Sequence, residues 1–201
     1  MEQYKRILLK EFDSKQKVIT ELINLEAILN LPKGTELYLS DIHGEFEAFD
    51  YILRTCAGNL NEKINDCFGE KLSKEEKDKL TLLIAYPQEV LSDGFLYPLK
   101  DKSWYGEIIQ NLLTLLAFVA AKYTRSKVRK ALPPQYAYII EELLYTDRNL
   151  PDSNIYFETI QNYLIDLGEA SQFISALAKV IRQLIIDHLH IVGDIFDRGA
   201  A

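Results

Sequence analysis

Two short β-prone segments near opposite ends of this 201-residue sequence constrain its fold more than any other feature. They are Glu36 to Ser40 and His188 to Val192, and acidic residues follow each of them directly. The first segment leads into Asp41-Ile42-His43-Gly44, and the second leads into Gly193-Asp194-Ile195-Phe196-Asp197-Arg198-Gly199. Side chains at strand ends are held rigidly at the open rim of a sheet. We therefore expect both motifs to meet on neighbouring strands.

The residues between these two segments follow helical rather than strand patterns. Ser73 and Glu76 form a capping box, and Phe46 opens an apolar stripe that recurs at helical spacing. The predicted helices run from Ser14 to before Pro32, Phe46 to Cys56, Ser73 to before Pro87, Trp104 to Tyr123, Gln135 to Tyr145, Ser153 to Asp166 and Glu169 to Ile186. Loops are predicted around Asp93-Gly94 and Tyr97-Pro98, and a turn from Asp147 to Asp152.

This pattern predicts the α/β class, with the start of a sheet, two strands visible, and a mostly α-helical composition. We divide the chain into three parts. Residues 1–44 hold N-terminal helices and the first strand, residues 45–187 form a large α-helical insertion or cap, and residues 188–201 hold the second strand with its truncated motif.

The chemistry of the two motifs is that of a metal site. Asp41 and His43 are two positions apart, so in an extended segment they point the same way and can grip one cation. Asp194 would arrive from the neighbouring strand as a bridging carboxylate, because its two oxygens can be shared by two metals. Together these residue types indicate the first half of a two-metal phosphoesterase site.

Two further residues of the second motif have predicted roles in catalysis. Arg198 supplies a permanently charged, planar fork for the phosphate oxygens. Asp197 would orient an imidazole that protonates the leaving alkoxide, and we expect that imidazole to lie outside this sequence. A dinuclear site needs roughly ten to twelve ligand positions. We therefore expect a fragment of a phosphatase that does not turn over substrate by itself.

The same residues could have purely structural roles. Asp41 could cap the following helix, while Gly193 and Gly199 could be turn glycines. Turn chemistry, however, requires neither His43 nor Arg198 at its position. His188 and His190 alternate with apolar residues on the second strand, and we predict that they are packed or hydrogen-bonded rather than metal ligands.

Four segments together resemble a known family, the class III fructose-1,6-bisphosphatases of Firmicutes, within the calcineurin-like metallophosphoesterase superfamily. They are Leu37 to Phe49, Tyr123 to Pro133, Ile139 to Leu144 and His188 to Gly199. The resemblance implies a cytoplasmic enzyme with a dinuclear Mn²⁺ centre, or Mg²⁺ in its place. It implies removal of the 1-phosphate of fructose 1,6-bisphosphate in gluconeogenesis. Members of that family are much longer and continue with an Asn-His-acid motif and further histidines.

The resemblance also assigns residues. It implies that Asp41, His43 and Asp194 are metal ligands and that Arg198 binds phosphate. Two alternatives remain. The chain could belong to another calcineurin-like phosphoesterase that acts on phosphoproteins or dinucleotides, for which the long helical insertion is awkward. It could also be a non-catalytic helical assembly module with a metal motif.

A basic segment inside the insertion offers a second anion site. Five of nine residues are cationic, namely Lys122, Arg125, Lys127, Arg129 and Lys130. A bisphosphate needs a second anchor away from the metals, so Arg125 and Arg129 are candidate phosphate ligands. The alternative, which we favour, is a solvated helix face.

Charge and composition restrict the partners. The sequence has 23 basic and 30 acidic residues and a net charge of -7, which argues against nucleic acid and membrane as partners. The charged start carries no apolar signal-peptide core, so a cytoplasmic protein is expected. Cys56 and Cys67 are predicted to be free, partly buried thiols. An incomplete sheet should leave an apolar face exposed, so we expect a homo-oligomer that acts on a small sugar bisphosphate.

Overall fold

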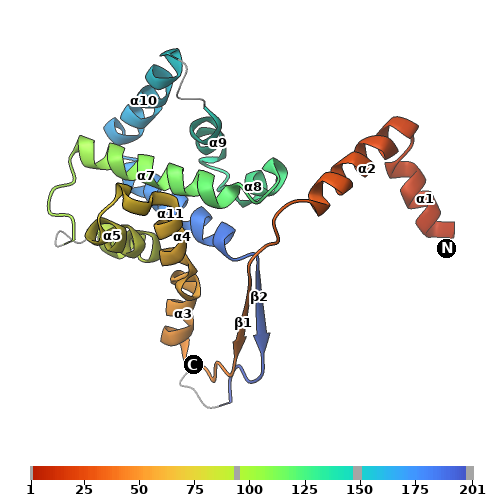
Figure 1. Cartoon of the computed structure of the whole chain (residues 1–201), viewed down its shortest axis with the longest axis horizontal. Helices are drawn as coiled ribbons and strands as arrows, with labels where there is room; N and C mark the ends of the chain where they lie inside the picture. Colours follow the sequence, from red (N-terminus) through yellow and green to blue (C-terminus); the bar gives the residue numbers. More distant parts are fainter. Residues whose placement is uncertain (1, 93–95, 147–150, 198–201) are drawn as a thin grey trace.

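A computed structural model describes residues 2–92, 96–146 and 151–197 of the chain (Figure 1). Short 3₁₀ turns lie at Cys56–Gly58 and Gly69–Lys71. The helices and strands are α1 (Glu2–Glu11), α2 (Lys15–Leu29), β1 (Glu36–Ser40), α3 (Phe46–Arg54), α4 (Asn59–Phe68), α5 (Lys74–Ala85), α6 (Pro87–Ser92), α7 (Lys102–Ala120), α8 (Arg125–Ala131), α9 (Ala137–Tyr145), α10 (Pro151–Asp166), α11 (Ala170–Ile185) and β2 (His188–Val192).

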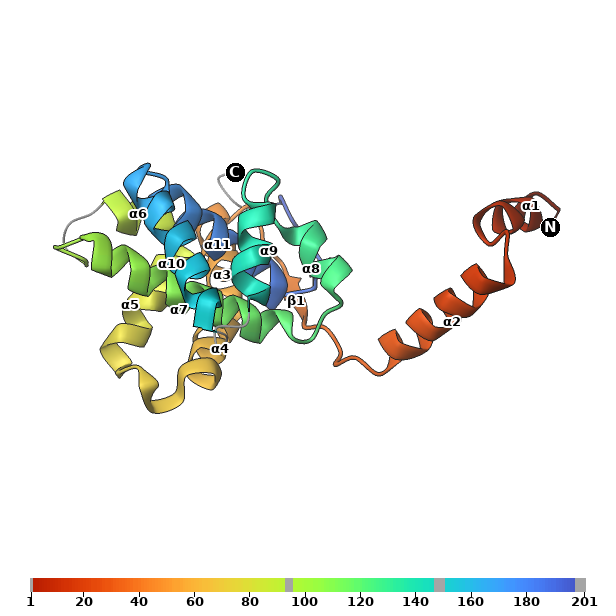
Figure 2. The ribbon, with the colours of Figure 1, turned by 90° about the horizontal axis from the view of Figure 1, so that it is seen from above.

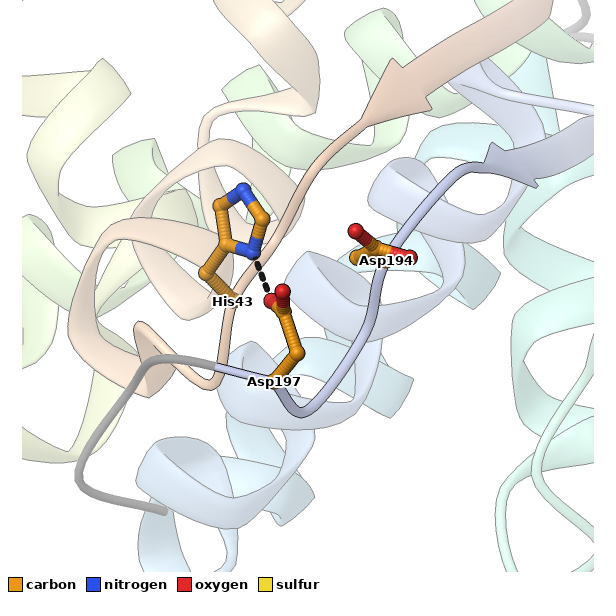
Figure 3. A group of neighbouring side chains, drawn as sticks. All are labelled: His43, Asp194 and Asp197. Atoms are coloured by element: carbon orange, nitrogen blue, oxygen red, sulfur yellow. Dashed lines mark hydrogen bonds and ion pairs between the residues drawn. The ribbon is translucent and has the colours of Figure 1, made fainter.

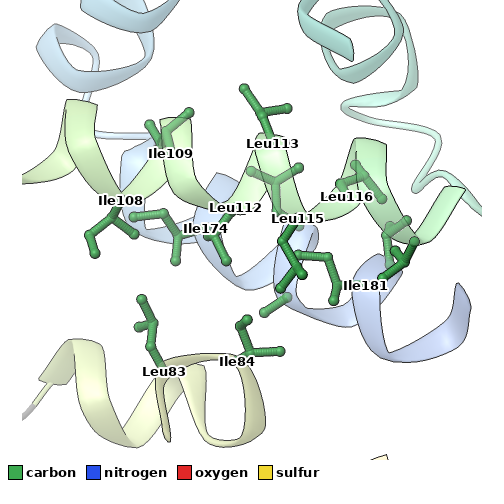
Figure 4. Packing of buried hydrophobic residues seen from close by; sticks show 14 of the residues in the cluster. Leu83, Ile84, Ile108, Ile109, Leu112, Leu113, Leu115, Leu116, Ile174 and Ile181 are labelled. Atoms are coloured by element: carbon green, nitrogen blue, oxygen red, sulfur yellow. The ribbon is translucent and has the colours of Figure 1, made fainter. Parts of the chain in front are cut away.

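Helices α4 to α11, which lie between the two strands in the sequence, form a helical body that contains the hydrophobic core. Helices α7 and α11 pack against each other at its centre, and α5 covers one side of this pair (Figure 4). Leu112 and Leu116 of α7 and Ile174 of α11 are completely buried. Burial of each such side chain stabilises the fold by about 1.5–3 kcal/mol relative to its exposure. The body therefore has its own core and can hold the two strands in place.

Local capping fixes where the main helices begin. Ser73 Oγ accepts a hydrogen bond from the backbone N–H of Glu76 at 3.2 Å, and the Glu76 carboxylate accepts one from the N–H of Ser73 at 2.7 Å. The predicted capping box is thus confirmed. Asp101 caps α7 through the N–H of Trp104 at 2.8 Å. The helix consequently begins before the predicted Trp104, and it ends at Ala120 rather than at Tyr123.

The other predicted helices are confirmed with small shifts at their ends, namely α2, α3, α9, α10 and α11. Among the described residues, α4 and α6 were not predicted, and α1 was expected only as part of the N-terminal helices of residues 1–44. These three helices have ten residues or fewer, a length at which helical periodicity is a weak signal. Helix α8 agrees with the helix face that we favoured for the basic segment. The loop predicted at Asp93-Gly94 and most of the turn predicted at 147–152 lie outside the described residues, and α10 begins at Pro151 within that turn.

Both predicted strands are confirmed, and they pair in parallel. Glu36 faces His188, and Ser40 faces Val192 at the other end of the ladder. Two parallel strands and a helical body agree with the predicted α/β class. Parallel sheets are normally covered on both faces. Here Tyr38 on one face is 62 % exposed and Ile191 on the opposite face is 40 % exposed, so the expected exposure of apolar side chains on the sheet is present on both faces.

Helices α1 and α2 form an arm that extends away from the helical body (Figures 1 and 2). Neither helix contains a buried residue. Ser14 caps α2 as predicted, since its Oγ accepts the N–H of Lys17 at 3.3 Å. In the part of the chain that the structure describes, no helix is both long and apolar enough to span a membrane.

Cys56 belongs to the hydrophobic core of the helical body, and Cys67 packs against that core. Cys56 is buried, Cys67 is partly buried, and both are free, as predicted. Burial raises the pKa of the Cys56 thiol to about 11. This thiol is therefore protonated at neutral pH and contributes to packing rather than to reactivity.

One buried carboxylate joins the beginnings of the two strands. Asp187, whose side chain is 1 % exposed, accepts the backbone N–H of Thr35 at 2.9 Å. It also accepts from Lys122 Nζ at 3.3 Å and from Lys127 Nζ at 2.5 Å. A Cβ on Gly34 would lie 2.3 Å from Asp187 Oδ2, so only glycine allows this approach. We call this group of contacts the Asp187 clamp.

Neutralising Asp187 should destabilise the fold. Asp187→Asn keeps the size of the side chain but removes the charge that Lys122 and Lys127 share. We expect the free energy of unfolding in urea at pH 7 to fall by about 2 kcal/mol. Asp78→Asn, on the exposed face of α5, is the matched control and should change it by less than about 0.5 kcal/mol. Equal effects of the two substitutions would contradict the clamp.

The same contacts predict a pH dependence. Burial opposes ionisation of Asp187, but Lys127, Tyr123 and the Thr35 N–H outweigh it and lower its pKa from 3.8 to about 2. A carboxylate with a lowered pKa stabilises the folded state fully above its unfolded pKa, and this contribution is lost as the pH falls through the folded pKa. The stability difference between wild type and Asp187→Asn should therefore shrink between about pH 4 and pH 2.

Candidate metal site

The two motifs lie side by side because the strand pairing continues past the strand ends. The N–H of His43 donates to the carbonyl of Asp194 at 3.2 Å, and the N–H of Gly44 donates to the carbonyl of Ile195 at 2.6 Å. Residues about 150 positions apart in the sequence thus share one edge of the sheet. The expected meeting of the motifs is confirmed.

The backbone of the first motif is a tight turn rather than an extended strand. Asp41 and His43 have φ angles of 53° and 52°, in the left-handed region. The expectation that these residues point the same way from an extended segment is therefore wrong, because β1 ends at Ser40 and the chain turns back toward α3. Aspartate and histidine tolerate this region better than most residues. Such strain is concentrated at functional sites.

The second motif fits against this turn through a glycine. Gly193 has a φ of 95°, and a Cβ there would lie 2.5 Å from Asp41 Oδ1. The same Asp41 oxygen accepts the N–H of Asp194 at 3.4 Å. Asp41 therefore packs on the backbone that carries Asp194. A larger residue at position 193 would push these two carboxylates apart.

Three side chains gather at this edge (Figure 3). One ligand atom from each of His43, Asp194 and Asp197 lies within 4.8 Å of the others. His43 comes from the turn after β1, while both aspartates follow β2. His43 is partly buried, and the two carboxylates are exposed. An imidazole with two carboxylates at such separations fits the ligand preferences of Mn²⁺ and Mg²⁺.

Asp197 contacts His43 directly, through Oδ1 and Nδ1. This hydrogen bond raises the pKa of His43; burial opposes the rise, and the charges of Asp197, Asp41 and Asp194 add to it. We predicted from the sequence that Asp197 orients an imidazole outside this chain. In the structure, its carboxylate instead contacts the imidazole of His43. A carboxylate on one ring nitrogen fixes the orientation of a metal-binding histidine.

The two remaining predicted site residues are Asp41 and Arg198. Asp41 is beside the group of three, with its carboxylate on the backbone of the second motif. Arg198, the predicted phosphate ligand, lies outside the described residues.

The strand histidines have other partners. The ring of His190 stacks on Tyr38 with centroids 4.5 Å apart, and its Nε2 lies 3.2 Å from a carboxylate oxygen of Glu36. The ring of His188 lies 6.2 Å from that of His190. The prediction that His190 is a packed residue is confirmed.

The basic segment is largely compensated by other groups. Lys122 and Lys127 belong to the Asp187 clamp, Arg129 Nε lies 2.7 Å from Glu141 Oε1, and Arg125 stacks 4.6 Å from the ring centre of Tyr145. These contacts favour a structural role for the segment. Phosphate binding by Arg125 and Arg129 stays a prediction.

The sequence comparisons agree with this geometry. Residues 3–201 match the family described as Firmicute fructose-1,6-bisphosphatase. The fructose-1,6-bisphosphatase class 3 of Streptococcus gordonii is 68 % identical over 200 residues, covering 100 % of this chain and 31 % of the relative. That of Streptococcus sanguinis is 70 % identical over 199 residues, covering 99 % and 31 %. That of Listeria monocytogenes is 50 % identical over 198 residues, covering 98 % and 30 %.

This chain spans just under a third of the length of these curated relatives. No solved structure shows a significant match to it.

Removal of one carboxylate should weaken metal binding by this chain. We expect Asp194→Asn to raise the dissociation constant for Mn²⁺, measured by electron paramagnetic resonance, by at least about tenfold. The matched control is Glu47→Gln, an exposed carboxylate on α3 outside the group of three, and it should leave the constant unchanged. An Asp194→Asn protein that binds Mn²⁺ as tightly as wild type would exclude this residue as a ligand.

Proposed function

Because this chain belongs to the Firmicute fructose-1,6-bisphosphatase family, we propose that the complete protein hydrolyses the 1-phosphate of fructose 1,6-bisphosphate. The products would be fructose 6-phosphate and inorganic phosphate, as gluconeogenesis requires. The observation that carries this proposal is the convergence of His43, Asp194 and Asp197 at one sheet edge, within a chain that matches the family along almost its whole length.

The proposed cofactor is a pair of Mn²⁺ ions, with Mg²⁺ as the alternative. His43, Asp194 and Asp41 would hold the cation nearest to this part of the protein, since they supply an imidazole and hard oxygen ligands. When bound, such cations supply Lewis acidity and lower the pKa of a coordinated water to near neutrality. The sheet edge is proposed to be the start of a calcineurin-like metallophosphoesterase sheet.

The protein's own residues have separable tasks in this proposal. Asp197 positions the His43 ring through Nδ1, which leaves Nε2 to face a ligand. Gly193 allows Asp41 and the Asp194 backbone to approach, so that both carboxylates stay at the same edge. Arg198, next in sequence to Asp197, would pair its guanidinium with the phosphate oxygens as negative charge increases there.

The number of metal ligands in this chain determines whether it can be active without the rest of the protein. His43, Asp194 and Asp41 provide fewer ligands than two octahedral cations require. Hydrolysis is therefore expected of the complete protein rather than of residues 1–201. The remaining donors would come from the part of the complete protein that corresponds to the unmatched length of the relatives.

The test is phosphate release from fructose 1,6-bisphosphate with added Mn²⁺, with fructose 6-phosphate measured as the second product. We expect turnover by the complete protein and none above background by this chain. In the complete protein, Asp194→Asn should lower kcat by about a thousandfold or more, because the cation that polarises the phosphoester is lost.

Glu47→Gln in the complete protein serves as the control and should keep wild-type kcat. Equal phosphate release from an unrelated phosphomonoester would point to another phosphoesterase. No release of phosphate by the complete protein with either cation would refute the proposal.

A further inference from the structure

A pocket lies between one face of the sheet and the helical body. It has a volume of about 430 Å³ and is bounded by β1, β2, α3, α6 and α11. Leu37 and Leu189, which pair in register on the two strands, form part of its apolar floor. Figure 1 shows α3 running beside the two strands. The metal-site residues lie beyond the strand ends, so this pocket is a separate place on the molecule.

Three cationic side chains line this pocket: Arg54, Lys179 and Arg182. Lys179 and Arg182 are three positions apart on α11 and therefore lie on the same side of that helix. Nη1 of Arg54 and Nη1 of Arg182 donate to the same carbonyl oxygen, that of Ala85, at 3.4 and 3.2 Å. Two guanidinium groups are thus held close together at the pocket wall.

The charges at this wall are not balanced. Arg54 pairs with Asp50 at 2.6 Å and with Glu89 at 3.6 Å. Within the described part of the chain, neither Lys179 nor Arg182 has a carboxylate within 4.0 Å. Burial lowers the pKa of the Arg182 guanidinium, and the charge of Arg54 lowers it further. The lining holds three cations and one carboxylate, Asp50, and Glu89 beside Arg54 brings the carboxylates to two, so the wall keeps a positive excess in a protein whose net charge is -7.

The basic segment at 122–130 differs from this pocket in how its cations are paired. There Lys122, Lys127 and Arg129 are each paired with a carboxylate. On α11, by contrast, Lys179 and Arg182 form no ion pair with any described carboxylate, and we selected neither residue from the sequence. Gln88 and Gln183 add amide groups to the same lining and can donate further hydrogen bonds.

We propose that this pocket binds the phosphate group of a small phosphorylated ligand, with Lys179 and Arg182 as its principal contacts. The guanidinium fork matches two phosphate oxygens, and the ammonium group supplies a third donor. The apolar floor would accept the carbon skeleton of the ligand. This inference depends on the pocket alone and does not rest on the proposed hydrolysis.

The experiment is a titration of the ¹⁵N-labelled chain with inorganic phosphate, at constant ionic strength and without divalent cations, followed by amide chemical shifts. We expect saturable shifts around Gln88 and from Lys179 to Gln183. Lys179→Gln, an exposed position that should not affect folding, should raise the dissociation constant about fivefold. Arg182→Lys keeps the charge but loses the fork, and it should also weaken binding.

Lys74→Gln is the matched control, since it removes an exposed helix lysine outside the pocket. It should leave the dissociation constant unchanged. Shifts that do not saturate, or an equal loss in Lys179→Gln and Lys74→Gln, would overturn the proposal, because either result indicates only diffuse attraction between phosphate and surface charge.

The phosphate could belong to the substrate or to a different ligand, and a second experiment separates these sources. Leu37 and Asp41 are four residues apart, so the pocket floor and the metal-site turn lie at most about 14 Å from each other. In the complete protein, a raised KM for fructose 1,6-bisphosphate in Lys179→Gln would assign the site to the second phosphate of the substrate. An unchanged KM with weakened inorganic phosphate binding would assign it to a separate ligand.

Discussion

Asp187 connects two chain segments that lie 152 positions apart, and the candidate site depends on that connection. Its carboxylate binds the N–H of Thr35 at the entrance to β1, while its own backbone N–H donates to the Thr35 carbonyl at 2.8 Å. Lys122 and Lys127 hold the same carboxylate from the helical body. The register of the two strands follows from this anchor, and the register places Asp41 and His43 opposite the turn that carries Asp194 and Asp197.

Local signals in the sequence were sufficient to predict both strands, the capped helix α5 and the meeting of the two acidic motifs. These features depend on neighbouring residues or on the rule that parallel strands share an edge. The left-handed turn at Asp41 and His43 was not predictable in the same way, because it depends on hydrogen bonds to residues far along the chain. The contact of Asp197 with His43 and the clustering of Arg54 with Arg182 arise only when distant segments pack.

The uneven distribution of burial divides the described chain into a self-sufficient part and an incomplete part. Helices α5, α7 and α11 share a closed apolar core, whereas the sheet and the arm of α1 and α2 leave large apolar side chains exposed. Parallel strands gain most of their stability when both faces are covered. The two strands therefore owe their placement to the helical body rather than to a core of their own.

The separation of β1 from β2 by the entire helical body has a consequence for the order of folding. Pairing these strands closes a loop of about 150 residues, and the entropy of that closure costs roughly 4 kcal/mol. Helices α4 to α11 make their contacts over shorter stretches of chain and can form first. The cluster of His43, Asp194 and Asp197 is then among the last features to assemble. A newly synthesised chain would carry no organised cation site until its helical body is already built.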